Sequence, residues 1–447
     1  MLSFKGLCNT DMEKKTNKTL LKKISTPEAL KNAWNKLVKF NKESRGLSGM
    51  TIEKFGENLD DHILSISKRL KTNNYKFSQT RGVLIVKKDK NSFRPLQIPE
   101  TSDRVVIKAM AIELEDIFKP TLMQSDGYSF AYQKYTGVKD AMLKVQDYYN
   151  KGNRYVLEAD LVNFFGTVNK KELLEKKIFP NLPDNSIDLL INEALNQKIG
   201  NLTEFEAQQK LYFDGIENGI PQGNALSPLF SNIYLSDFDK KIISNNFNLV
   251  RYADDFVILA ETKRECREAY KKCLLYLKEL DLEIHPLEKN DKTKITDISK
   301  DSFTFLSVTF DGNFLFPSYD NFKKLENKIW ELTKGQIELN LFDFLKKLKN
   351  RHEGWISAFI YTDLNRYSER LDYIINRALY IKLEKIDWKL IQSRLDKIPK
   401  NYRSKIGSPY CINKKQRIHS GIPLTSHLIT GKIEKIKSKE ELKIEEK

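Results

Sequence analysis

The sequence of 447 residues contains only four cysteines, and no two of them form a CxxC pair. A zinc ribbon is therefore not expected. Cys266 and Cys273 lie seven positions apart in a stretch of helical character. We expect them to share one face of a helix and not to form a disulfide. Histidine is also scarce, and His285 has no second histidine at metal-binding spacing, which favours a surface or packing role.

Long apolar runs are missing as well. No segment reaches the roughly 18 uncharged apolar residues of a membrane-spanning helix, and the N-terminus has no uninterrupted apolar signal core. We expect a cytoplasmic protein with no membrane partner. There is no internal repeat, and the length predicts two to four packed units instead of one core.

Acidic residues are outnumbered, with 60 Asp and Glu against 76 Lys and Arg and a net charge of +16. This excess favours a polyanionic partner, although a basic surface without a dedicated partner has the same composition. The imbalance is greatest in residues 397–433, which contain no acid, eight basic residues and two interleaved tyrosines, Tyr402 and Tyr410. The segment is either a nucleic-acid surface or a flexible basic tail.

The most informative segment is Leu249–Leu259, in which Asp254 and Asp255 stand between two apolar, β-prone arms. The arms predict a hairpin with the acid pair at or beside its turn. Adjacent carboxylates repel each other unless a cation neutralises them, and Mg²⁺ is a hard cation that takes oxygen ligands. An Asp-Asp pair at a turn can also be merely solvated, so the interpretation depends on a third acid.

That third acid is Asp160, which ends a strand-like segment beginning near Tyr155. Glu158 shares its face of the strand and is expected to support the site. A strand that ends on an acid beside a hairpin tipped with Asp254 and Asp255 can place three carboxylates around two metal ions. Two ions about 3.5–4 Å apart serve an in-line phosphoryl displacement.

Residues 219–235 lie between the acid-bearing segments and contain Gly219-Ile220-Pro221-Gln222-Gly223 followed by an apolar stretch. This composition predicts a loop that leads into a helix and lets a flat base pair approach the backbone.

The order of these three segments resembles the palm of reverse transcriptases, most closely the bacterial enzymes related to group II introns. The resemblance covers roughly residues 25–390. Beyond these three segments it rests on six further ones: Gly46–Thr51 for the N-terminal extension, Arg81–Asp89, Arg94–Pro99 and Asp103–Val106 for the fingers, Phe305-Leu306-Ser307 for the primer grip, and Gly354-Trp355 for the thumb.

The resemblance implies that Asp160, Asp254 and Asp255 bind two Mg²⁺ ions, for which Mn²⁺ could substitute. It also implies that Phe165, five positions after Asp160, closes the sugar pocket against a 2′-hydroxyl. Phe164 is expected to point into the core if the stretch is extended, and either ring could simply be core.

For the incoming dNTP, the resemblance implies that Lys87 and Arg94 grip the triphosphate, with Lys88 and Lys90 as alternatives to Lys87. Gln222 and Gly223 are expected to form the floor under the nascent base pair. Lys292, or alternatively Lys294, is expected to approach the triphosphate from a palm loop.

Several positions depart from the family pattern. Tyr128–Lys134 replaces the Gly-Phe-Arg-Pro-Gly of mobile-intron members, Asn224 follows the Pro-Gln-Gly, Ser307 replaces the primer-grip glycine, and Asn196–Gln209 is a polar, insertion-like stretch. The sequence shows no endonuclease Cys/His cluster and no acids suggesting RNase H. With these departures the sequence resembles domesticated bacterial reverse transcriptases associated with antiphage defence. Those proteins often use a dedicated non-coding RNA.

We therefore predict an α+β right-hand polymerase with fingers, palm, a helical thumb and a short basic C-terminal extension. The expected parts are a basic segment 1–24, N-terminal extension and fingers 25–153, palm 154–316, thumb 317–395 and extension 396–447. Helices are expected over parts of 27–75, over 103–118 and 137–151, and from Pro317 to about residue 394.

The predicted activity is RNA-directed DNA synthesis from dNTPs, which yields a DNA product. The expected template is a structured non-coding RNA. Three alternatives remain: a compact group II intron-encoded maturase, an RNA-dependent RNA polymerase, against which Phe165 argues, and a non-catalytic RNA-binding scaffold. The sequence does not specify the template, the primer or the oligomeric state.

Overall fold

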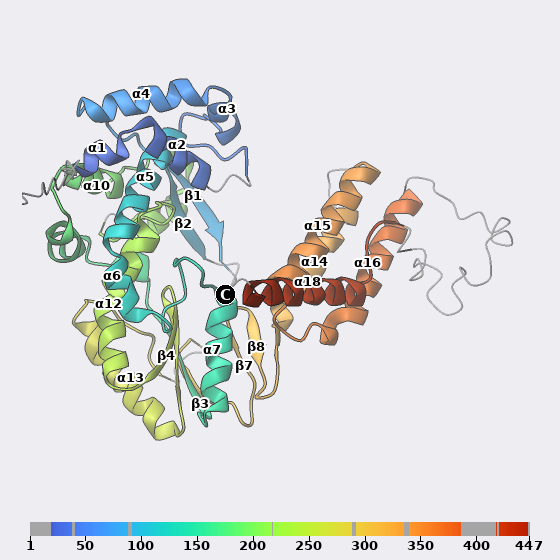
Figure 1. Cartoon of the computed structure of the whole chain (residues 1–447). Helices are drawn as coiled ribbons and strands as arrows, with labels where there is room; N and C mark the ends of the chain where they lie inside the picture. The colour runs from blue at the N-terminus through green and yellow to red at the C-terminus, as the bar shows by residue number, and fades with distance from the viewer. Residues whose placement is uncertain are drawn as a thin grey trace, which may run out of the picture. The chain divides into compact units, whose positions relative to one another are not determined.

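The computed structural model describes residues 19–37, 41–87, 92–216, 218–287, 292–334, 339–385, 417 and 420–445 (Figure 1). The chain divides into two compact units. The first consists of Met1–Lys134, Ala159–Val257 and Arg267–Lys294, and the second of Tyr135–Glu158, Ile258–Cys266 and Ile295–Lys447.

The first unit begins with short helices that gather around one long helix, α5 (Thr101–Ile117), as Figure 1 shows. They begin at good capping residues: the Thr26 side chain accepts a hydrogen bond from the amide of Ala29, and Pro27 occupies the first turn. The helices expected within 27–75 and over 103–118 are confirmed. The short helices are α1 (Leu20–Ile24), α2 (Pro27–Lys36), α3 (Ile52–Glu57) and α4 (Leu59–Lys71).

The predicted strand pair of the fingers is an antiparallel hairpin of β1 (Arg81–Val86) and β2 (Phe93–Ile98). Ile85 lies opposite Arg94, and the amide of Lys87 donates a 2.8 Å hydrogen bond to the carbonyl of Ser92. This register places Lys87 and Arg94 near the same end of the hairpin. Two short elements, α6 (Lys119–Leu122) and η1 (Met123–Ser125), follow α5.

Four strands form a sheet in the order β4-β5-β3-β6. The predicted hairpin is confirmed, because β4 (Asn248–Tyr252) and β5 (Asp255–Ala260) are neighbours and their apolar residues are buried. The strand expected to end on Asp160 is β3 (Tyr155–Asp160), and β6 is Lys294–Asp297.

Helix α12 (Ser227–Ser244) is buried on nearly all sides, as expected for a core helix with apolar residues around its circumference. Helix α13 (Lys263–Lys278) contains Cys266 and Cys273, which are both buried free thiols, as predicted. Short elements connect β3 to α12: α8 (Phe164–Thr167), α9 (Lys170–Glu172), η2 (Leu173–Ile178), η3 (Phe179–Asn181), α10 (Asp188–Leu195), η4 (Leu202–Glu204), α11 (Ala207–Lys210) and η5 (Leu211–Phe213).

The second unit contains a small antiparallel sheet, the predicted helix α7 (Val138–Asn150) and the helices that follow Pro317. The rings of Phe322 and Tyr367 stack at 4.4 Å in the core between these helices, and Trp355 packs edge-on against both. The remaining elements are β7 (Phe303–Phe305), β8 (Val308–Phe310), β9 (Leu315–Pro317), α14 (Tyr319–Lys334), α15 (Leu341–Phe359), α16 (Asn365–Lys385) and α18 (Thr425–Glu445).

Arg417 anchors the start of the last helix. Its guanidinium lies 2.6 Å from the Asp372 carboxylate and donates a 2.7 Å hydrogen bond to the Pro423 carbonyl. The same Asp372 oxygen accepts a 2.9 Å hydrogen bond from the Thr425 amide. Arg417 is fully buried, so it is not an exposed cation of the basic segment. Six other basic residues of that segment, and Tyr402 and Tyr410, lie outside the described residues.

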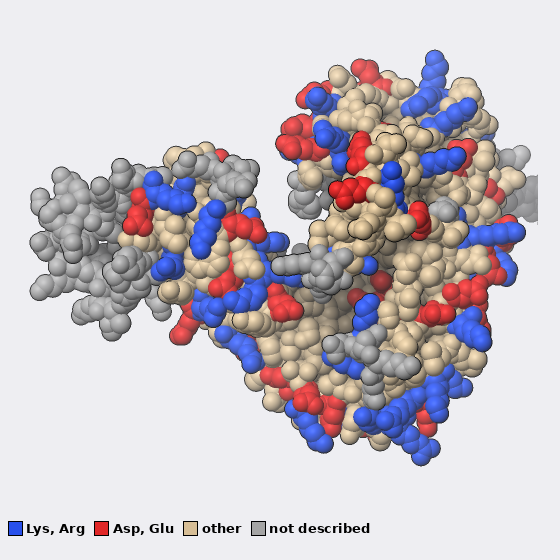
Figure 2. All heavy atoms as spheres, turned by 180° about the vertical axis from the view of Figure 1, so that it is seen from behind, with Lys and Arg blue, Asp and Glu red and all other residues tan. Residues whose placement is uncertain are grey.

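On the face in Figure 2, Lys and Arg side chains are interspersed with Asp and Glu. None of the helices in the described part of the chain combines the length and apolarity that a bilayer crossing requires.

Candidate active site

A cavity of about 530 Å³ in the first unit brings together most of the residues predicted from the sequence. It lies among the ends of β2, β3 and the β4–β5 hairpin and the loop before α12. Of the predicted residues, the cavity is lined by Lys87, Arg94, Asp160, Phe165, Gln222, Asp254 and Lys292, whereas Asp255 and Gly223 lie outside its lining.

Asp160 is the last residue of β3, and its carboxylate faces two basic side chains. The ammonium group of Lys292 lies 3.2 Å from it, and the ring of His285 lies 3.9 Å from the same oxygen. Nζ of Lys292 and Nε2 of His285 are 3.1 Å apart. The sequence did not predict that His285 would lie beside an acid of the site.

The turn of the β4–β5 hairpin places Asp254 in the cavity. Ala253, just before it, has a left-handed backbone with φ +60°, a conformation that costs free energy in a residue other than glycine. Burial, and next the charge of Asp160, raise the pKa of Asp254. Asp255, which begins β5, is exposed.

The donor set fits a hard divalent cation. Asp160 and Asp254 supply carboxylate oxygens, the ligands that Mg²⁺ prefers, and their mutual repulsion is relieved when a cation lies between them. Among the residues that the structure describes, no three His, Cys, Asp or Glu side chains are grouped closely enough to hold a metal ion. Asp160, Asp254 and Asp255 therefore all remain predicted ligands.

The chain turns sharply after Asp160. Asn163 is left-handed, with φ +46°, and residues from Phe164 form one helical turn, so the extended conformation considered for this stretch is wrong. Phe164 is nevertheless buried, and Phe165 is half-buried. Their rings meet edge-on at 5.3 Å. Phe165 thus reaches the cavity from a turn that Phe164 anchors in the core.

Close backbone approaches explain the glycines of the loop before α12. A Cβ atom on Gly219 would lie 2.0 Å from the carbonyl oxygen of Phe165, and one on Gly223 would lie 2.4 Å from that of Gln97. Gly223 also has φ +110°. The amide of Ile220 donates a 2.9 Å hydrogen bond to the Phe165 carbonyl. The two glycines therefore let this loop contact both the turn that contains Phe165 and strand β2.

Asn224, which stands where the family often has glycine, stabilises the loop with its side chain. Its amide group donates a 2.8 Å hydrogen bond to the Ala194 carbonyl, and its oxygen accepts one of 2.9 Å from the Leu226 amide. This departure from the family pattern is compatible with the same loop.

Two cations at the end of the β1–β2 hairpin line the cavity, Lys87 and Arg94, and both are exposed. Lys88 and Lys90, the alternatives to Lys87, lie outside the described residues.

Sequence reasoning missed three aromatic residues of the cavity, Phe93, Tyr132 and Tyr212. Tyr132 is left-handed, with φ +60°; its pKa is raised by burial and then by the charge of Asp254. The ring of Tyr212 packs edge-on against Phe93 of β2 at 5.3 Å.

The polar stretch that leads to Tyr212 is attached to the β1–β2 hairpin. The side-chain oxygen of Asn201 accepts a 2.7 Å hydrogen bond from the Gly82 amide, and Ile199 bridges to Thr80. No local pattern in the sequence signals these pairings.

Curated relatives align with most of the chain at low identity. The protein YkfC of Escherichia coli is 26% identical over 329 residues, which is 64% of this chain and 81% of YkfC. The group II intron-encoded protein LtrA of Lactococcus lactis is 26% identical over 252 residues, 56% of this chain. The chain spans only 38% of LtrA.

Solved structures also resemble it. Apo telomerase from Candida tropicalis is 15% identical with a TM-score of 0.39, covering 78% of this chain and 64% of that one. A chain of a partial Cas6-RT-Cas1–Cas2 complex is 24% identical with a TM-score of 0.34, covering 59% of this chain and 42% of that one.

A family model described as "Reverse transcriptase (RNA-dependent DNA polymerase)" matches residues 85–310, a range that contains every predicted site residue. Because the match takes in just over half of the 447 residues, this chain belongs to the reverse transcriptase family.

Proposed function

We propose that this protein is an RNA-directed DNA polymerase that extends a primer 3′-hydroxyl with dNTPs on an RNA template. The observation that supports it is the convergence, in one cavity, of Asp160 and Asp254 with the cations Lys87, Arg94 and Lys292. Acids that hold a metal and bases that neutralise a triphosphate are the groups that phosphoryl transfer requires.

In this proposal the acids of the cavity bind the metal ions and its cations bind the triphosphate. Asp160 and Asp254, with Asp255 adjoining, would hold two Mg²⁺ or Mn²⁺ ions, which supply activation of the primer hydroxyl and neutralisation of the leaving pyrophosphate. Arg94, Lys87 and Lys292 neutralise the triphosphate of the dNTP. The exposed position of the first two leaves their guanidinium and ammonium groups free to rotate toward that ligand.

Three further residues fit the nucleoside. Phe165 packs under the deoxyribose and leaves no room for a 2′-hydroxyl. Gln222 and Gly223 support the nascent base pair, because the loop that contains them lies against the backbone of β2.

Primer extension tests the activity. The purified chain is given an RNA template, an annealed DNA primer, Mg²⁺ and either dNTPs or rNTPs, and the double variant Asp254→Ala, Asp255→Ala serves as the matched control. We expect extension with dNTPs by the wild type alone. Extension that persists in the double variant, or none in either protein, contradicts the proposal.

We also propose that the template is a dedicated, structured non-coding RNA and that synthesis serves antiphage defence. The support is the replacement of the mobile-intron motif by Tyr128–Lys134, together with the resemblance to domesticated bacterial reverse transcriptases.

Sequencing of the RNA and DNA that co-purify with the wild type and with the double variant tests this second step. One discrete RNA in both samples, with complementary DNA in the wild type only, supports it. A bound intron RNA that the protein helps to splice would instead identify a maturase. Discrete RNA without DNA in either sample would identify a scaffold.

A further inference from the structure

Arg251 in β4 is a fully buried cation that the proposed mechanism does not use. Only 1% of its side chain is exposed, and none of the side chain of its partner Asp239 in α12. The guanidinium makes a two-point contact with that carboxylate, Nε to Oδ1 at 2.7 Å and Nη2 to Oδ2 at 2.5 Å. A buried ion pair of this kind is seldom more stabilising than an apolar pair of similar volume, so stability alone does not account for it.

The third guanidinium nitrogen of Arg251 reaches the catalytic turn. Its Nη1 donates a 2.9 Å hydrogen bond to the carbonyl oxygen of Ala253 and a 3.0 Å one to the side-chain oxygen of Asn232 in α12. Ala253 has the left-handed φ of +60° and directly precedes Asp254. The hydrogen bond therefore fixes the peptide from which the Asp254 side chain enters the cavity.

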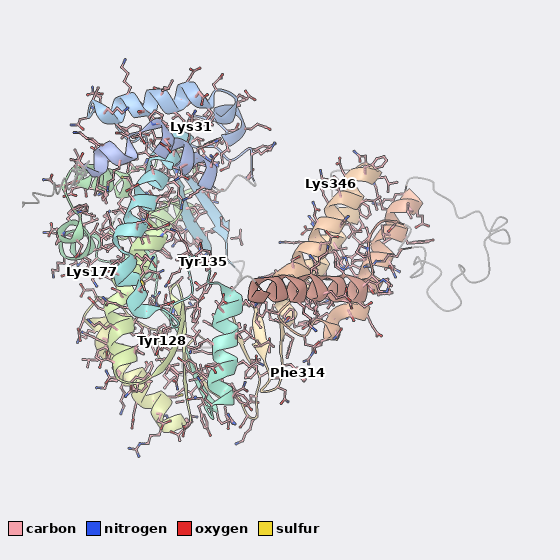
Figure 3. All side chains as sticks on the ribbon, viewed as in Figure 1. Lys31, Tyr128, Tyr135, Lys177, Phe314 and Lys346 are labelled. Carbon is pink, nitrogen blue, oxygen red and sulfur yellow. The ribbon has the colours of Figure 1, made fainter. Side chains whose placement is uncertain are left out.

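The same group of residues also holds the segment that ends in Tyr132. The Asn232 side chain donates a 2.8 Å hydrogen bond to the Ala131 carbonyl. The backbone of Arg251 pairs with that segment on both sides, donating at 2.8 Å to the carbonyl of Tyr128, labelled in Figure 3, and accepting at 2.9 Å from the Phe130 amide. Tyr132 itself has a left-handed backbone and lines the cavity.

We propose that Arg251, Asp239 and Asn232 form a positioning unit that sets the Asp254 turn and the Tyr132 segment in register with each other. This inference rests on the proposed polymerase function. The unit acts through the Ala253 and Ala131 carbonyls and does not touch substrate. Asp239 fixes the guanidinium plane, Arg251 fixes the turn, and Asn232 connects the turn to the Tyr132 segment.

The test separates positioning from stability. In the double variant Arg251→Met, Asp239→Leu an apolar pair replaces the ion pair, so we expect a melting temperature close to that of the wild type. The Ala253 carbonyl loses its donor, and we expect kcat for dNTP incorporation to fall about 10–100-fold, the usual effect of losing a group that orients a metal ligand. The KM for dNTP and the affinity for primer–template should change little.

Asn232→Ala keeps the ion pair and provides a second variant if the double variant does not fold. Like the double variant, it should lower kcat. The control is Tyr234→Phe on the same helix, which removes a buried 2.7 Å hydrogen bond to the Leu280 carbonyl. It should lower the melting temperature and leave kcat unchanged.

Mn²⁺ binding, followed by electron paramagnetic resonance without any substrate, gives a readout independent of turnover. We expect Mn²⁺ affinity to fall about tenfold or more in the double variant and in Asn232→Ala. If the Arg251→Met, Asp239→Leu variant is as stable as the wild type and keeps the wild-type kcat and Mn²⁺ affinity, the positioning role is overturned. A wild type that binds Mn²⁺ but extends no primer would refute the proposed function, and the affinity comparison would still test the positioning unit.

Discussion

The backbone amide of Gln97, in β2, donates a 2.8 Å hydrogen bond to the carbonyl oxygen of Gln222, in the loop before α12. The next residue, Gly223, makes this contact sterically feasible, since a Cβ atom there would lie 2.4 Å from the Gln97 carbonyl oxygen. The β1–β2 hairpin and the Gln222 loop of the cavity are thus coupled through the backbone.

Gly223→Ala should break this coupling. The added methyl group must push the loop away from β2, and the φ of +110° adds strain for any residue other than glycine. We expect kcat/KM for dNTP incorporation to fall about 10–100-fold, as expected for a displacement of the order of 1 Å. Steady-state primer extension measures it. Gly354→Ala is the control, because nothing lies within 4 Å of a Cβ at that helical position. Equal activity of the two variants would contradict this account.

Phe165→Ala should relax sugar selection. Removing the ring opens the space in which we expect the deoxyribose to lie, so the preference for dNTP over rNTP should fall about tenfold or more. The ratio of the two kcat/KM values measures it. Phe164→Leu serves as the control, since it alters the buried neighbour and leaves Phe165 in place. Unchanged sugar discrimination in Phe165→Ala would rule out Phe165 as the gate.

The local elements of the site could be predicted because each depends on a short pattern. Alternation of apolar residues predicts β3 and the β4–β5 hairpin, and the acids at their ends predict a shared site for Asp160 and Asp254. The glycines before α12 likewise predict a close backbone approach. Asp160 and Asp254 line one cavity together with five residues that were predicted from the family resemblance, Lys87, Arg94, Phe165, Gln222 and Lys292.

The missed features depend on contacts between distant parts of the chain or on unusual backbone conformations. Tyr132 enters the cavity because its φ is +60° and Asn232 holds the preceding residue, neither of which a local pattern reveals. At Asn163 the chain enters a helical turn, whereas the sequence interpretation considered an extended segment there. Arg417 lies in a basic run but is buried against Asp372, since ion pairs with distant acids leave no trace in local composition.

His352 makes the stability of the second unit depend on pH. It is fully buried in α15, and burial first, then the charge of Arg417, lowers its pKa from 6.5 to about 3. Between those values the unfolded chain binds a proton that the folded chain does not, so stability is highest above pH 6.5 and is lost as the pH falls. At pH 5 the loss should be about 2 kcal/mol.

Thermal unfolding at pH 7.5 and at pH 5 measures this effect. In His352→Gln, the amide can still pair with the Thr425 hydroxyl, which lies 3.1 Å from Nε2 of the wild-type ring, and no proton is taken up. The difference between the two pH values should therefore shrink in the variant. A difference as large as that of the wild type would assign the pH dependence to other groups.

Ser307 should store strain that glycine would remove. Leu306 and Ser307 form the tight turn between β7 and β8 with φ values of +52° and +66°, and the Ser307 carbonyl accepts a 2.9 Å hydrogen bond from the Ser318 amide just before α14. A left-handed residue with a Cβ costs about 1–2 kcal/mol, and part of the gain from glycine is offset by its greater freedom in the unfolded chain. Ser307→Gly should raise the free energy of unfolding by about 0.5–1 kcal/mol, measured by chemical denaturation. Ser302→Gly, at a nearby exposed position without a positive φ, should leave stability unchanged or lower it. If both variants lowered stability equally, the turn would tolerate serine without strain.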